Sequence, residues 1–227
     1  NRFPIMKKLI LNFKSKDSKK IKNPKNFLGG KGANLSKMGR MGLPVPPGFT
    51  ISTKVCEIFY TDKKKLNKNL VAQIKKELKI IEKDVGKKFG DLKNPLLLSV
   101  RSGARVSMPG MMDTILNLGL NDKTVNALTL KTSNGRFAKD SYRRFIQMYG
   151  NVVMGVESYH FEELIENYKL TKGVLLDTDL DESDWDGLIV DFKRTVKEKT
   201  KKDFPQDVYE QLLGAISAVF LSWESNR

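Results

Sequence analysis

The spacing of hydrophobic positions changes near residue 121. Before it, short apolar runs are separated by glycine, proline and lysine, and after it apolar residues recur at helical spacing. The first part predicts strands at 7–13, 49–51, 96–100 and 114–118, and helices at 33–38, 53–60 and 64–84. The second part predicts helices at 122–131, 135–154, 158–169, 182–200 and 206–224. This order predicts two lobes, one mixed α/β and one helical.

Local signals mark where these elements begin and end. Residues 14–26 read as a polar, lysine-rich loop, and 27–32 as a glycine turn. Thr53 is a candidate N-cap for the helix that follows it, and Asp203-Phe204-Pro205 interrupts the chain before the last helix. Two amphipathic helices stand out by their apolar stripes, which are Leu66, Leu70, Ile74, Leu78 and Ile81, and Phe137, Tyr142, Phe145, Ile146 and Tyr149.

Composition excludes several classes of protein. With 40% hydrophobic and 30% charged residues the chain has a globular composition, which argues against disorder, collagen and coiled coil. The single cysteine, Cys56, excludes an intrachain disulfide and a cysteine-based zinc site, and the single histidine, His160, excludes a histidine pair. No apolar run approaches the roughly 18–20 residues of a membrane span, and residues 1–20 lack a signal-peptide pattern. We therefore expect a cytoplasmic protein with no membrane partner.

The net charge of +15 is unevenly distributed. Residues 1–93 hold 24 basic and 7 acidic side chains, whereas residues 94–227 hold 17 and 19. A basic N-terminal lobe could attract nucleic acid or a polyphosphate ligand. The lysines also fit solvated helix faces, because runs such as 63–65 fall within a helical pattern and few aromatic residues are interleaved with them.

Three segments could carry chemistry. In residues 28–35 (LGGKGANL), glycines can point successive backbone N–H groups at an anion, next to a helix N-terminus and Lys31. In residues 98–105 (LSVRSGAR), Arg101 follows an apolar strand, where it needs a carboxylate or a bound phosphate as partner. Residues 108–114 (MPGMMDT) place two methionines in a Pro-Gly loop, which suits a loop over a ligand or one folded back on the core. Taken singly, each segment also fits a structural role.

Together, in this order and at these intervals, the three segments closely resemble the N-terminal nucleotide-binding region of the pyruvate, phosphate dikinase family. The matching stretches are 27–53 (FLGGKGANLSKMGRMGLPVPPGFTIST), 95–122 (PLLLSVRSGARVSMPGMMDTILNLGLND), 136–149 (RFAKDSYRRFIQMY) and 204–223. The resemblance covers nearly the whole chain from about Leu9 and is weakest in the lysine-rich stretches 14–26 and 62–88. The loop SMPGMMDT is its most specific part, because phosphoenolpyruvate synthases share the Gly-Gly-Lys-Gly and Val-Arg-Ser segments but lack this loop.

The resemblance implies an α+β fold, the N-terminal part of an ATP-grasp-type nucleotide-binding domain with a helical insert. We expect residues 1–120 and 206–227 to form the α/β lobe and 121–205 the insert. The family's enzyme converts ATP, phosphate and pyruvate to AMP, diphosphate and phosphoenolpyruvate by way of a phosphohistidine on a separate domain. Lys31 and Arg101 match its polyphosphate-contacting residues and are the candidate catalytic groups. The candidate nucleotide-binding residues are Gly29, Gly30, Lys31, Gly32, Arg101, Gly110, Met111, Met112, Asp113 and Thr114.

Other parts of the family's enzyme have no counterpart in the sequence. Its magnesium ligands and adenine contacts fall beyond Arg227, and His160 lacks the Thr-Ser-His context of the phosphorylated histidine. We therefore expect about half of an ATP-grasp domain, inactive alone, that binds ATP and phosphate together with Mg²⁺ held elsewhere. Its partners would be the phosphohistidine domain and the pyruvate-binding barrel of the same enzyme, which would form a homodimer through domains absent here.

Two alternatives stay open at this point. One is a phosphoenolpyruvate synthase-like enzyme, and the other is a basic module that binds nucleic acid through its lysines. The second alternative predicts arginines clustered with aromatics, whereas the sequence shows dispersed lysines and leaves the SMPGMMDT loop unexplained. We therefore expect no specific nucleic-acid partner.

Overall fold

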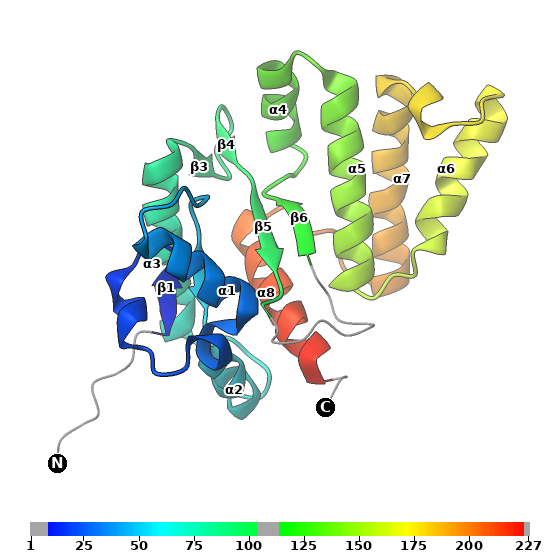
Figure 1. Cartoon of the computed structure of the whole chain (residues 1–227). Coiled ribbons are helices and arrows are strands. Elements are labelled where there is room, and N and C mark those ends of the chain that lie inside the picture. The colour runs from blue at the N-terminus through cyan, green and yellow to red at the C-terminus, as the bar shows by residue number, and fades with distance from the viewer. Residues whose placement is uncertain (1–8, 104–113, 225–227) are drawn as a thin grey trace. The chain divides into compact units, whose positions relative to one another are not determined.

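The computed structural model describes residues 9–103 and 114–224 (Figure 1). Contacts divide the chain into two compact units. Unit 1 comprises residues 1–86, 102–113 and 219–227, and unit 2 comprises 87–101 and 114–218. The described residues mix helices with three two-stranded sheets, which confirms the α+β class at its coarsest level. Residues 87–101 and 114–120 group with the helices, whereas the sequence suggested that they belong with residues 1–86. The lobe boundaries expected from the sequence stay a prediction.

Unit 1 is built on a small antiparallel sheet. Strands β1 (Ile10–Asn12) and β2 (Phe49–Ile51) pair with Ile10 opposite Ile51. Its helices are η1 (Lys16–Lys20), α1 (Pro24–Arg40), α2 (Thr53–Thr61) and α3 (Lys68–Val85). Its apolar core includes Ile10, Leu11, Leu28, Val55, Phe59, Ile74 and Leu78, each at most 2% exposed.

The start, the buried face and the end of helix α3 are each explained by its sequence. The Asn67 side chain caps its N-terminus by accepting the N–H of Leu70 at 2.9 Å. Leu70, Ile74, Leu78 and Ile81 are buried, as their spacing predicts, and Gly86 ends the helix in the left-handed conformation. The predicted helix at 64–84 is thus confirmed with a later start, because Lys63 and Lys64 take positive φ angles before it.

Unit 2 contains two small sheets and most of the helices. Strands β3 (Lys88–Phe89) and β4 (Pro95–Leu96) pair in parallel, and β5 (Leu98–Arg101) and β6 (Thr114–Leu118) pair antiparallel. The helices are α4 (Thr124–Thr132), α5 (Gly135–Val152), α6 (Tyr159–Lys172), η2 (Asp177–Asp179), α7 (Glu182–Thr200) and α8 (Val208–Glu224), whose last residues, 219–224, belong to unit 1. All five helices predicted after residue 121 are confirmed.

An aromatic cluster joins the helices of unit 2. Phe204 lies in the break before α8, as the sequence suggested, and its ring is 5.6 Å from the rings of Phe145 and Tyr149 on α5. On the neighbouring α7, Trp185 and Phe192 are fully buried. Phe137 does not join this core: it belonged to the predicted apolar stripe of α5, but it is 51% exposed.

Three local expectations are corrected. Residues 27–32 are not a turn, because α1 begins at Pro24 and continues through them with a kink at Gly29. Thr53 is not an N-cap: Ser52 holds that position, and the Thr53 hydroxyl instead donates to the carbonyl of Asn26 at 2.7 Å. The strand predicted at 96–100 is split at Leu97 between β4 and β5.

Candidate functional site

The glycine-rich segment forms a kinked helix rather than an open loop. Gly29 has φ 74° and ψ 170°, which interrupts α1 and starts a second helical stretch running to Arg40. This region of the Ramachandran map is accessible almost only to glycine. Gly30, Lys31 and Gly32 therefore occupy the first turn of a new helical stretch, where backbone N–H groups and the helix dipole favour an anion.

Two of the glycines allow close packing in unit 1. A Cβ atom at Gly29 would overlap the carbonyl oxygen of Gly103, and one at Gly32 would lie 2.8 Å from the Thr50 side chain. Gly30 has open space at the same position, with no atom of the described residues within 4 Å. The lack of a side chain at Gly29 thus lets its backbone contact the backbone of Gly103, whereas Gly30 has unoccupied space beside the helix.

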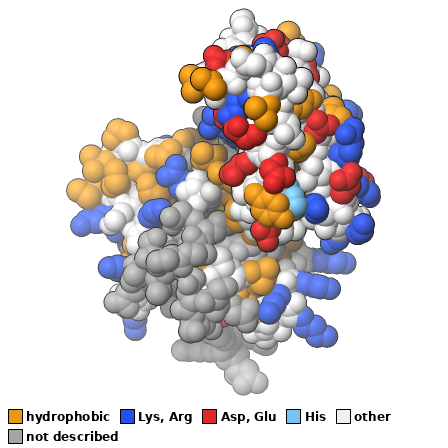
Figure 2. Space-filling view, turned by 90° about the vertical axis from the view of Figure 1, so that its right-hand side faces the viewer, with side chains coloured by type: hydrophobic (Ala, Val, Ile, Leu, Met, Phe, Trp, Pro, Cys, Tyr) orange, Lys and Arg blue, Asp and Glu red, His pale blue; other side chains and the backbone are white. Residues whose placement is uncertain are grey.

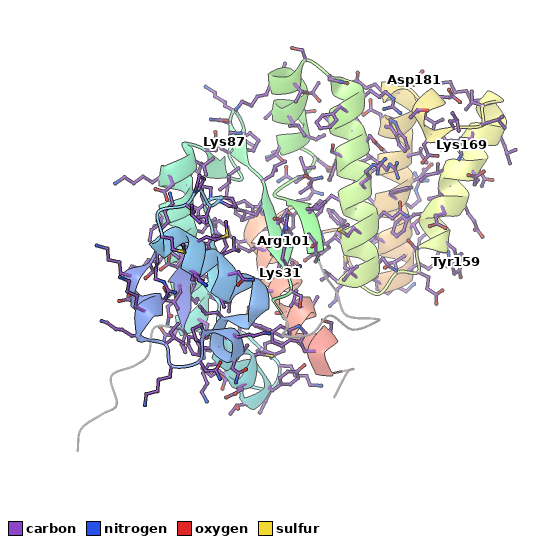
Figure 3. All side chains as sticks on the ribbon, in the orientation of Figure 1. Lys31, Lys87, Arg101, Tyr159, Lys169 and Asp181 are labelled. Carbon is purple, nitrogen blue, oxygen red and sulfur yellow. The ribbon has the colours of Figure 1, made fainter. Side chains whose placement is uncertain are left out.

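Lys31 is exposed at this new helical start. It forms no ion pair with any side chain in residues 9–103 and 114–224, so its ammonium group is available to a ligand. Figure 3 labels Lys31 and Arg101 on their elements. Lys37 is likewise exposed and lies on the same helix, which makes it a natural comparison for Lys31.

Arg101 is the last residue of β5, and Thr114, the first residue of β6, lies opposite it. The strand is only half-buried and Arg101 is exposed. Arg101 therefore does not need the carboxylate partner that a buried position would demand, and it forms no ion pair with the residues that the structure describes. Its guanidinium group can take a bidentate grip on a phosphate.

The predicted site residues therefore fall into two groups. Gly29, Gly30, Lys31 and Gly32 lie together on α1 in unit 1, and Arg101 lies opposite Thr114 in unit 2. The remaining candidates, Gly110, Met111, Met112 and Asp113, lie outside the described residues.

The described part of the chain contains no cluster of side chains suited to bind a metal ion. No group of three or more His, Cys, Asp or Glu residues there could hold one. His160 lies at the start of α6 with its ring 4.1 Å from that of Tyr159. The two rings are tilted by 39° and the histidine is half-buried, and its structural role stays a prediction.

Two basic side chains of unit 2 that form ion pairs, Arg143 and Lys169, have shifted pKa values. Burial lowers the pKa of Arg143, although the guanidinium lies 2.7 Å from Asp140 and 4.3 Å from the Trp185 ring centroid. Hydrogen bonds to Glu166 and then Asp177 raise the pKa of Lys169. These groups are held by protein partners, and none belongs to the predicted site.

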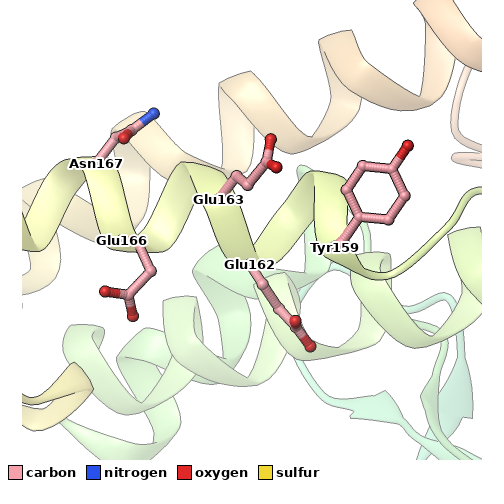
Figure 4. Close-up of a pocket in the computed structure, with 5 residues that line it drawn as sticks. All are labelled: Tyr159, Glu162, Glu163, Glu166 and Asn167. Atoms are coloured by element: carbon pink, nitrogen blue, oxygen red, sulfur yellow. The ribbon is translucent and has the colours of Figure 1, made fainter.

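An open hollow of about 300 Å³ lies along α6 (Figure 4). Its lining, all from this helix, is Tyr159, Glu162, Glu163, Glu166 and Asn167. Figure 2 faces this helix and shows acidic and basic side chains interspersed around it. The lining holds three carboxylates, of which Glu166 is paired with Lys169 at 2.6 Å, and none of the predicted nucleotide-binding residues, so the hollow is not the predicted nucleotide site.

Comparison with known proteins supplies the decisive observation. Residues 25–78 and 62–227 match the family described as pyruvate phosphate dikinase, AMP/ATP-binding domain. The chain belongs to this family. It is 52% identical over 204 residues to the pyruvate, phosphate dikinase of Clostridium symbiosum. The matched residues make up 89% of this chain and 23% of that protein. It is 51% identical over 220 residues to the chloroplastic pyruvate, phosphate dikinase of Mesembryanthemum crystallinum. That match covers 97% of this chain and 23% of the relative.

The chain spans about a quarter of the length of the curated relatives that it matches. The resemblance inferred from the three segments is therefore confirmed over nearly the whole chain, and the phosphoenolpyruvate synthase alternative is not favoured. None of the helices in the described residues is long and apolar enough to cross a membrane.

Sequence reasoning missed two features next to the site residues. Gly103 lies against Gly29, and the indole N–H of Trp223 donates to the Ser102 hydroxyl at 3.0 Å. The small residues after Arg101 hinted at close packing, but no pattern in the sequence names the distant residues that pack there.

Proposed function

We propose that this chain is the N-terminal nucleotide-binding part of a pyruvate, phosphate dikinase with an ATP-grasp-type architecture. The enzyme would convert ATP, phosphate and pyruvate to AMP, diphosphate and phosphoenolpyruvate. The observation that carries the proposal is the family match over residues 25–227, together with about 50% identity to enzymes of that name.

Within that reaction the chain would bind the polyphosphate of ATP. The N–H groups of Gly30, Lys31 and Gly32 begin a helical stretch, and the Lys31 and Arg101 side chains are exposed cations without a protein partner among the described residues. Catalysis of phosphoryl transfer depends largely on such positioning and charge stabilisation. Thr114 and the segment 110–113 would complete the phosphate contacts.

The groups that this chain does not supply would come from the rest of the enzyme. Mg²⁺ neutralises charge on a transferring phosphoryl group, and its ligands would lie outside the described residues, which offer no suitable cluster. The phosphoryl group would pass to a histidine on a separate domain, and a further domain would bind pyruvate. We also propose a cytoplasmic homodimer that assembles through those other domains.

Replacement of Lys31 tests the binding role. In the whole protein that carries this chain, Lys31→Met should weaken ATP binding about 10–100-fold, because a hydrogen bond to a charged group contributes roughly 1.5–3 kcal/mol. Isothermal titration with ATP measures the change. Lys37→Met removes an exposed lysine from the same helix and should leave the affinity unchanged. Equal affinity for the wild type and Lys31→Met would refute the role of Lys31.

A further inference from the structure

Ser102, the residue that directly follows Arg101, is held by a side chain from the end of α8. The indole Nε1–H of Trp223 donates to its hydroxyl oxygen at 3.0 Å, and Ser102 is only 6% exposed. Adjacent Cα atoms are about 3.8 Å apart across a trans peptide. Any shift of Ser102 therefore acts directly on the backbone of Arg101.

Trp223 is itself anchored in the core of unit 1. Its ring lies 6.1 Å from Phe220, whose ring in turn lies 5.4 Å from Phe59 on α2. The hydroxyl of Tyr60 donates to the carbonyl of Phe220 at 2.7 Å. The last turn of α8 is thus fixed to α2 by apolar packing and a hydrogen bond, which gives the indole a defined position.

The next residue, Gly103, is held by a different constraint. Its carbonyl oxygen lies where a Cβ atom of Gly29 would be, so the two backbones touch. Ser102 and Gly103 are consecutive, and each contacts a different element of unit 1. Two successive residues fixed in this way leave the chain little freedom immediately after Arg101.

We propose that Trp223 is a positioning residue for Arg101: through its hydrogen bond to Ser102 it sets the place from which the guanidinium group reaches the phosphates of ATP. This inference rests on the proposed function of Arg101. Displacement of a charge-stabilising group by about 1 Å can cost as much as 10²-fold in rate. A residue that never touches the nucleotide can therefore control its turnover.

Three variants of the whole protein separate positioning from stability. Trp223→Phe and Ser102→Ala each remove one partner of the hydrogen bond. Asn67→Ala removes the N-cap of α3 in the same unit, which lowers stability by about 1 kcal/mol without removing any contact of Trp223 or Ser102. We expect kcat/KM for the ATP half-reaction to fall about 10-fold in the first two variants and to stay at the wild-type value in Asn67→Ala. The exchange between phosphoenolpyruvate and pyruvate should be unchanged in all three, and Ser102→Ala keeps the test valid if Trp223→Phe does not fold.

A double mutant with Arg101→Ala shows whether the effect passes through Arg101. If it does, adding Trp223→Phe to Arg101→Ala causes no further loss, because the group that Trp223 positions is gone. A further 10-fold loss in the double mutant, or a Trp223→Phe variant with the same kcat/KM as Asn67→Ala, overturns the positioning role alone. If Arg101→Ala leaves the ATP half-reaction intact, the proposed role of Arg101 fails, and this inference fails with it.

Discussion

Gly29 combines two features that require glycine. Its backbone angles, φ 74° and ψ 170°, fall in a region that other residues rarely enter, and its missing Cβ leaves space for the carbonyl of Gly103. Both features arise from one event, the interruption of α1 just before Gly30, Lys31 and Gly32. The conformation of this single residue therefore decides where the second helical stretch begins.

Replacing Gly29 by alanine should destabilise the chain and displace residues 102–103. The backbone strain alone costs of order 1–3 kcal/mol, and the overlap with Gly103 adds to it. Denaturant unfolding measures the loss. Gly30→Ala is the matched control, since its Cβ meets no described atom within 4 Å and φ is not positive there. Equal stabilities for the two variants would contradict this account of the kink.

Arg101 shows which site features a sequence can predict. The succession of an apolar strand, an arginine and small residues was sufficient to select it, and the structure places it at the end of β5. Its exposure was not predictable, because whether a short strand is covered on both faces depends on elements distant in the chain. The kink at Gly29 escaped prediction for the same reason: its partner, Gly103, belongs to another segment.

At the scale of elements, α8 is held to the segment after β6 by one buried amide. Gln211 is fully buried, and its side chain accepts the N–H of Gly119 at 3.0 Å. The same amide donates to the carbonyls of Leu120 at 2.9 Å and Pro205 at 2.8 Å. Helical periodicity predicted α5, α7 and α8 well, since each buries one face, but it cannot reveal a polar residue that joins two loops distant in the sequence.

Gln211→Leu should therefore be strongly destabilising. It leaves three buried backbone groups without partners, and each such loss costs roughly 1–3 kcal/mol, so we expect at least about 3 kcal/mol in the free energy of unfolding. Gln206→Ala serves as the comparison. It removes hydrogen bonds to Asp122 and Tyr142 from an exposed side chain, where water can replace them, and should cost less than about 1 kcal/mol. A mild effect of Gln211→Leu would argue against its bridging role.

At the scale of the whole molecule, net charge differs between unit 1 and unit 2. Unit 1 holds 23 Lys and Arg against 8 Asp and Glu, and unit 2 holds 18 of each, so the entire net charge of +15 falls in unit 1. Unit 1 also carries Lys31 and the glycine segment. A positive field around the proposed polyphosphate contacts raises the local concentration of an anionic substrate.

Dispersed lysines should give the chain only weak, nonspecific affinity for nucleic acid. Counterion release alone corresponds to a Kd of roughly 10⁻⁴–10⁻⁶ M at physiological salt, and the affinity should fall steeply as salt rises. Anisotropy titrations with several duplexes of unrelated sequence test this expectation. Selective binding to one of them, tighter than about 10⁻⁸ M, would revive the nucleic-acid alternative.

The central claim, that this chain binds the ATP phosphates of a pyruvate, phosphate dikinase, is tested most directly by Arg101→Ala in the whole protein. Arg101 is exposed and has no ion-pair partner among the described residues, so the melting temperature should hardly change. The ATP half-reaction should fall about 10²–10³-fold, as for loss of one charge-stabilising donor, while exchange between phosphoenolpyruvate and pyruvate continues at the wild-type rate. A lowered melting temperature with an intact ATP half-reaction would show instead that Arg101 is structural and would contradict the account.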